Sequence, residues 1–92
     1  MDVVDAFIKR RFKKDCNWLD GNCYYFTLIL QSRFPDGIII YDPIEGHFLY
    51  RLGEFCYDYL GKHKLPEIYY VWEELEKEDP ALFKRIKRDC IL

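Results

Sequence analysis

Apolar residues near the start of the chain recur with helical spacing. Residues 2–14 place an apolar side chain every three or four positions, as one buried helix face requires. The residues of this face are Val3, Val4, Phe7, Ile8 and Phe12. Acidic residues begin the segment and basic residues end it, which is the order that the helix dipole favours. We therefore expect an amphipathic helix over residues 2–14 with a solvated basic end.

A second helix is predicted from Cys23 to about Phe34. It follows a polar, turn-rich loop over residues 15–22, and Asn22 is a suitable N-cap. The first two turns are apolar on almost every side, which is typical of a helix that other elements cover. The turn-forming residues 35–37, Pro-Asp-Gly, end this helix.

Three short strands and two helices are predicted in the rest of the chain. Residues 38–41 are mostly β-branched and predict a strand, and residues 47–52 and 54–59 predict two more around Gly53. Residues 62–66 are expected to form a loop and residues 68–77 a helix. Asp79 is the expected N-cap of a last helix that begins at Pro80.

This order of elements predicts one α+β domain over residues 1–92, with a three-stranded antiparallel sheet. We expect the 23–34 helix to cover the sheet face that carries His47. The helices at the two ends should cover the other face. That face is expected to carry Phe48, Tyr50, Phe55 and Tyr57.

Composition and charge exclude several classes of protein. The chain has 92 residues, half of them hydrophobic, and a net charge of -2, which argues against a disordered chain and against a strongly basic nucleic-acid binder. The longest apolar run, residues 24–30, is too short to span a bilayer, and no secretory signal is evident. We therefore expect a cytoplasmic protein without a nucleic-acid or membrane partner.

The four cysteines are interpreted as reduced thiols, because a cytosolic chain rarely forms disulfides. They are Cys16, Cys23, Cys56 and Cys90. No CxxC or HxxxH spacing predicts a zinc site, and no glycine-rich phosphate loop is present. No metal and no cofactor are therefore expected.

Cys23 has the position of an activated nucleophile. A thiol at a helix N-terminus has a lowered pKa, although a cysteine in an apolar helix is more often a small core residue. His47 begins a strand, and Asp58 lies on the next strand. A hairpin loop at residues 52–53 would place Asp58 opposite His47, and a loop at residues 53–54 would place it diagonally. Both registers put the two side chains on one face, as a base and its orienting acid require.

The sequence resembles the minimal papain-like fold over roughly residues 17–61. The matching pieces are Gly21-Asn22-Cys23, Gly46-His47-Phe48 and Tyr57-Asp58. Small bacterial papain-fold toxins and cell-wall amidopeptidases are the most similar branches, and transglutaminase-like domains are more distant. The resemblance implies that Cys23 is the nucleophile, His47 the general base and acid, and Asp58 the orienting acid.

The same resemblance supplies an oxyanion candidate, and the positions of two other residues near Cys23 supply further candidates. Asn17 has the spacing of the papain-group oxyanion donor, although glutamine is usual there, and Asn22 or the backbone N–H of Cys23 is the alternative. Trp18 is a candidate wall of a substrate cleft. Cys16 is a candidate redox partner of Cys23.

Other side chains are assigned simpler roles. Asp42 is more simply a turn former than a second orienting acid. Cys56 and Cys90 are expected in the core, and His63 is expected in a solvated loop.

The sequence therefore predicts a small cysteine hydrolase that cleaves an amide or peptide-like bond through an acyl-enzyme. Its partner would be a protein or peptide-like substrate, and a partner protein could complete the site. The alternative is a non-catalytic interaction module, or a phage or mobile-element effector, that keeps a papain-like fold. Acyl transfer and deamidation use the same three residues and stay open.

Overall fold

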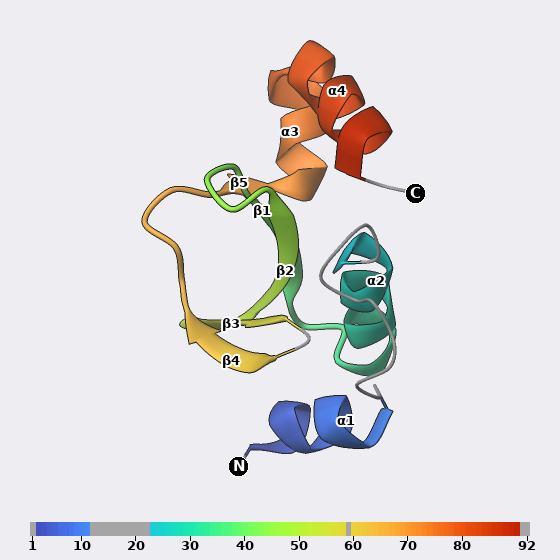
Figure 1. The fold of residues 1–92 in the computed structure, drawn as a ribbon, viewed down its shortest axis with the longest axis vertical. Helices are drawn as coiled ribbons and strands as arrows, with labels where there is room; N and C mark the ends of the chain where they lie inside the picture. Colours follow the sequence, from blue (N-terminus) through green and yellow to red (C-terminus); the bar gives the residue numbers. More distant parts are fainter. Residues whose placement is uncertain (1, 12–22, 59, 91–92) are drawn as a thin grey trace.

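The computed structural model describes residues 2–11, 23–58 and 60–90 as four helices and one five-stranded antiparallel sheet (Figure 1). The helices are α1 (Val3–Arg11), α2 (Cys23–Arg33), α3 (Trp72–Glu78) and α4 (Pro80–Cys90). The strands are β1 (Ile38–Asp42), β2 (His47–Leu52), β3 (Phe55–Asp58), β4 (Gly61–Lys64) and β5 (Tyr70–Val71). The α+β class is confirmed.

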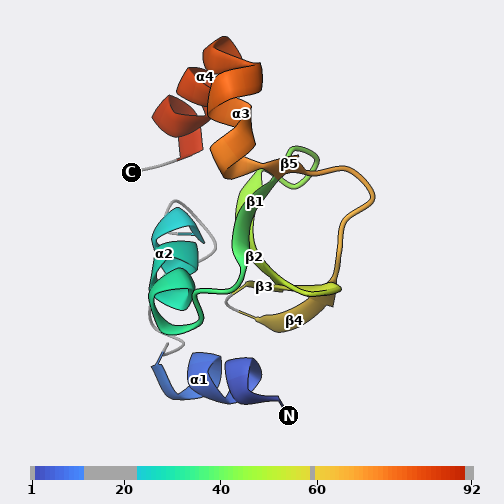
Figure 2. The same ribbon diagram turned by 180° about the vertical axis from the view of Figure 1, so that it is seen from behind.

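The sheet is a meander of four strands to which β5 returns. The strand order is β4-β3-β2-β1-β5, and every neighbouring pair is antiparallel. Residues 53–54 form the tight turn between β2 and β3, where Gly53 adopts φ 66°. This positive φ is a conformation that glycine adopts without steric cost. Figure 2 shows the chain after β4 bending back to reach β5 beside β1.

One face of the sheet holds the main core, to which all four helices contribute. Alternate strand residues point to this face, as the two-residue period of a strand requires. The buried sheet residues are Ile39, Tyr41, Phe48, Tyr50 and Tyr57. The helices contribute Val4 and Ile8 of α1, Cys23, Phe26 and Leu30 of α2, Trp72 and Leu75 of α3, and Ile86 of α4.

The opposite face holds a smaller cluster, to which none of the four described helices contributes. Its buried residues are Ile40, Leu49 and Cys56. Leu65 and Tyr69, from the segment between β4 and β5, pack against this cluster. The segment 65–69 therefore covers the second face, on the side of the sheet away from α2 (Figures 1 and 2).

The number of strands and the layering differ from the sequence prediction. The sheet has five strands instead of three, because the expected 62–66 loop contains most of β4 and the expected 68–77 helix begins with β5. The helix that starts at Cys23 covers the face of Phe48, and not the face of His47 as predicted. It is also less enclosed than expected, since Tyr25 and Leu28 are 38% and 37% exposed.

Several local predictions are confirmed. The first helix covers residues 3–11 of the predicted 2–14, although Val3 is 69% exposed and does not join the buried face. The backbone N–H of Leu82 donates to Asp79 Oδ1 at 3.1 Å, so Asp79 caps α4 as expected. Phe12 and the 15–22 loop lie outside the described residues.

Hydrogen bonds from two buried tyrosines tie the helices to the sheet. The hydroxyl of Tyr50 on β2 donates to the carbonyl oxygen of Phe34 and accepts from the N–H of Gly37 at 3.0 Å. The hydroxyl of Tyr57 on β3 donates to Asp2 Oδ2 at 2.7 Å, beside the start of α1. Burial raises the pKa of both tyrosines, so each remains a donor at physiological pH.

Candidate functional site

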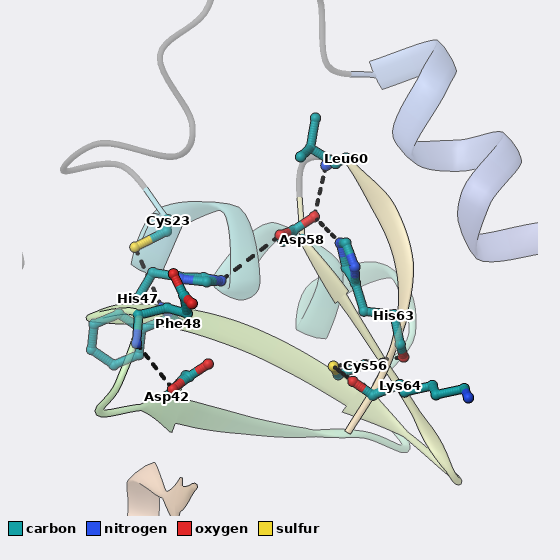
Figure 3. A network of polar contacts seen from close by, with 10 residues as sticks. Cys23, Asp42, His47, Phe48, Cys56, Asp58, Leu60, His63 and Lys64 are labelled. Carbon is teal, nitrogen blue, oxygen red and sulfur yellow. Dashed lines mark hydrogen bonds and ion pairs between the residues drawn. The ribbon is translucent and has the colours of Figure 1, made fainter. Parts of the chain in front are cut away.

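Cys23 is the first residue of α2 and is 4% exposed. Its sulfur accepts a hydrogen bond from the backbone N–H of Phe48 at 3.5 Å. This contact places the thiol beside the start of β2, at the residue that follows His47 (Figure 3). A backbone N–H donor and the N-terminal end of a helix both favour a negatively charged sulfur.

His47 begins β2 and extends toward Asp58. Its Nε2 lies 3.8 Å from Asp58 Oδ2, and the His47 side chain is 21% exposed. This separation exceeds the usual hydrogen-bond range of about 2.7–3.2 Å, and the buried Nε2 has no hydrogen-bond partner among the described residues. Figure 3 shows the imidazole directed at the Asp58 carboxylate.

Asp58 ends β3 and is 6% exposed. Its Oδ1 accepts two hydrogen bonds, from the backbone N–H of Leu60 at 2.8 Å and from His63 Nε2 at 2.7 Å. Its Oδ2 is the oxygen that faces His47. The carboxylate therefore bridges two imidazoles that come from β2 and β4.

The hairpin register explains why His47 and Asp58 share a face. Of the two predicted registers, the structure adopts the one with its turn at residues 53–54, and Tyr50 pairs with Tyr57. Continued by one pair, this register puts Asp58 opposite Leu49, which is two residues from His47 and on the same face. The diagonal placement of Asp58 is therefore confirmed.

The three predicted side chains thus come from α2, β2 and β3 to one end of the sheet. The sequence prediction of this proximity depended on element order and strand register. It also placed the Cys23 helix on the face of His47, whereas Cys23 lies in the core on the face of Phe48 and meets β2 through the backbone N–H of Phe48. The assignment of the three side chains as catalytic residues stays a prediction.

A cavity of about 230 Å³ opens beside the two imidazoles. Its lining residues are Asp42, His47, Leu49, Cys56, Asp58, His63, Lys64 and Pro66. Burial, with the nearby charges of Asp58 and Asp42, raises the pKa of the Cys56 thiol to about 11. Cys56 is fully buried, as the sequence predicted, and it remains a protonated thiol at neutral pH.

Asp42 has the simpler of its two predicted roles. Its Oδ1 accepts hydrogen bonds from the backbone N–H groups of Ile44 and Glu45, at 2.9 and 3.2 Å. These contacts fix the turn between β1 and β2, where the sequence places an Asp-Pro pair. Asp42 is therefore a turn former, and the acid that faces His47 Nε2 is Asp58.

His63 is the site residue that sequence reasoning missed. It was expected in a solvated loop, but it lies on β4 and contacts Asp58 directly. Residues 62–64, Lys-His-Lys, are all exposed on an edge strand. They therefore lack the alternation of apolar and polar residues from which a half-buried strand is predicted. Gly61 was the sequence signal that could have revealed this contact. A tight turn just before Gly61 would have placed His63 diagonally from Asp58 on the neighbouring strand.

The remaining candidates lie where the structure gives no side-chain position. Asn17, Trp18, Asn22 and Cys16 are outside the described residues, and only the backbone of Cys90 is described, at the end of α4. Across residues 2–11, 23–58 and 60–90, no group of three or more His, Cys, Asp or Glu side chains has metal-binding geometry. No helix in these same ranges has the length and apolar character needed to cross a membrane.

The chain matches one described protein family along most of its length. The sequence model of a family described as Phage YunG-like protein matches residues 4–86. This range contains Cys23, His47, Asp58 and His63. No curated protein and no solved structure matches the chain.

Proposed function

The chain belongs to the Phage YunG-like protein family, and we propose that it is a phage-associated cysteine hydrolase that cleaves an amide or peptide-like bond. The observations that carry this proposal are the contact of Cys23 with the backbone of the residue after His47, and the approach of His47 to Asp58. Cys23 begins a helix, His47 begins the strand that contacts its sulfur, and Asp58 faces the imidazole of His47. A papain-like site would use the same three residue types in the same order along the chain.

The proposed reaction uses these three residues in turn. The Cys23 thiolate attacks the carbonyl carbon of the substrate, and the C–N bond breaks as His47 gives its proton to the leaving amine. The product of this half-reaction is a thioester on Cys23. A water molecule then gives a proton to His47 and attacks the thioester carbon, and the acid product leaves as the thiolate re-forms.

Asp58 would hold the imidazole in place during both steps. A carboxylate beside an imidazole stabilises its protonated form, which is the partner that a thiolate needs. The 3.8 Å separation of Nε2 and Oδ2 is consistent with this role. Hydrogen bonds in catalytic sites are often long before the substrate binds and shorten afterwards.

Selective alkylation of Cys23 tests the proposal. In the folded protein at pH 6, iodoacetamide should label Cys23 faster than it labels the same cysteine in the urea-unfolded chain, because an activated thiol is ionised well below its usual pKa of about 8.5. His47→Ala should slow this labelling by about tenfold or more, and Asp58→Asn should slow it less. Mass spectrometry of peptides gives the rate at each cysteine.

Cys56 is the internal control for this experiment. Burial and nearby charges raise the pKa of its thiol to about 11, so Cys56 carries almost no thiolate at pH 6 and should stay unlabelled while the protein is folded. A Cys23 that is inert at pH 6, or that reacts equally with and without His47, would contradict the proposed hydrolase.

A non-catalytic interaction module is the second candidate. It is supported by the family, whose description names a phage protein and no reaction. In this candidate, large apolar side chains that reach solvent would form part of the binding surface. These include Ile44, Leu60 and Ile68, which are 73%, 69% and 56% exposed. This candidate predicts slow labelling of Cys23 that does not depend on His47.

A further inference from the structure

Asp58 accepts hydrogen bonds on one oxygen and faces His47 with the other. Oδ1 is held by the Leu60 N–H at 2.8 Å and by His63 Nε2 at 2.7 Å. Oδ2 is the oxygen nearest to His47, at 3.8 Å. Two donors on Oδ1 restrict rotation of the carboxylate about its Cβ–Cγ bond, and this restriction directs Oδ2 at the imidazole.

We propose that His63 is a positioning residue whose imidazole fixes the Asp58 carboxylate so that Oδ2 is presented to His47. The inference rests on the proposed function, in which His47 is the general base and acid. His63 itself does not contact the substrate in this proposal. It acts through Asp58.

The chemistry of the 2.7 Å contact determines which group donates. An ionised carboxylate has only acceptor oxygens, so Nε2 of His63 must carry the proton. A neutral imidazole with its proton on Nε2 satisfies this requirement, and so does an imidazolium. His63 can therefore hold Asp58 whether or not it is charged.

The position of His63 is fixed by its own strand. His63 pairs with Cys56 across β3 and β4, and its carbonyl oxygen lies 3.7 Å from the Cys56 sulfur. Its side chain is 42% exposed, whereas that of Asp58 is 9% exposed. The imidazole therefore covers the carboxylate from the solvent side. The other titratable groups around the same cavity are Asp42, Cys56 and Lys64.

Two variants of His63 separate its hydrogen bond from its charge. In His63→Gln the amide nitrogen reaches about as far as Nε2 and can donate to Asp58, but the side chain does not titrate. In His63→Leu neither the donor nor the charge remains. The chain has only two histidines, so each variant leaves His47 as the single imidazole in an NMR titration.

The expected result is a higher pKa for His47 in His63→Gln than in His63→Leu, by about half a unit or more, because a carboxylate directed at an imidazole favours its charged form. Equal values in the two variants, or a lower value in His63→Gln, would overturn the inference. A lower value in His63→Gln would indicate that His63 competes with His47 for Asp58. If His63 only stabilised the fold, its replacement would change the melting temperature, but the pKa of His47 would be the same in both variants.

The two proposals fail independently. The titration measures only the coupling of His47 to Asp58, and it gives an answer even if Cys23 is unreactive. Selective labelling of Cys23 together with equal His47 pKa values would overturn the role of His63 alone. If the His63→Leu variant does not fold, His63→Ala replaces it in the comparison. Alanine also lacks the hydrogen-bond donor, and this edge strand is exposed.

Discussion

Replacing Phe48 with alanine should lower the free energy of unfolding by about 3–5 kcal/mol, the range for truncating a fully buried aromatic side chain. Phe48 is 0% exposed, at the centre of the main core. Its ring makes edge contacts with Tyr24, Tyr41 and Trp72, at centroid distances of 5.1, 5.0 and 4.9 Å. One side chain thus joins α2, β1 and α3, and its removal leaves a cavity among all of them.

Urea denaturation followed by circular dichroism measures this loss, and Phe55→Ala is the matched control. Phe55 is 38% exposed and its ring contacts the ammonium of Lys62 at 3.9 Å, so its truncation should cost only about 1 kcal/mol. Equal losses in the two variants would mean that Phe48 does not join the layers as described.

Gly37→Ala should lower the free energy of unfolding by about 3 kcal/mol, because the added methyl group overpacks the contact with the ring of Tyr50. A Cβ atom at this position would lie 2.6 and 2.8 Å from ring atoms of Tyr50, and it would also collide with the backbone oxygen of Arg51. Tyr50 is fully buried and its hydroxyl is hydrogen-bonded on both sides, so the ring cannot move away cheaply.

Gly53→Ala is the control for the loss of a glycine. Gly53 has φ 66° and no heavy atom within 4 Å of its added Cβ, so alanine there should cost only the left-handed backbone strain of about 1 kcal/mol. The same denaturation experiment compares the two variants. A Gly37→Ala protein as stable as Gly53→Ala would contradict the close contact between Gly37 and Tyr50.

The parts of the fold that were predictable have a strong local pattern. The β-branched run before residue 42 and the glycine turn at residue 53 are signals carried by the residues themselves. Asp79 and Pro80 similarly mark the start of α4. The approach of His47 to Asp58 was also predictable, because both two-residue turns that include Gly53 put the two side chains on one face of the sheet.

The parts that were missed depend on tertiary contacts. β5 has two residues, and it is a strand only because β1 offers an unpaired edge. The face that α2 covers could not be read from its sequence, because the helix is apolar nearly all round and has no single preferred side. His63 was missed for a related reason. Its role comes from a carboxylate on the neighbouring strand.

The two outer strands of the sheet bear on whether copies of this protein aggregate. A free sheet edge offers unpaired N–H and C=O groups to a second molecule, and lysines on such an edge oppose that pairing. β4 is one edge and presents Lys62 and Lys64 to solvent, while the other edge, β5, is only two residues long. Neither edge is a good template for intermolecular β-pairing. The solubility of the chain at high concentration should therefore depend on the two lysines that flank His63.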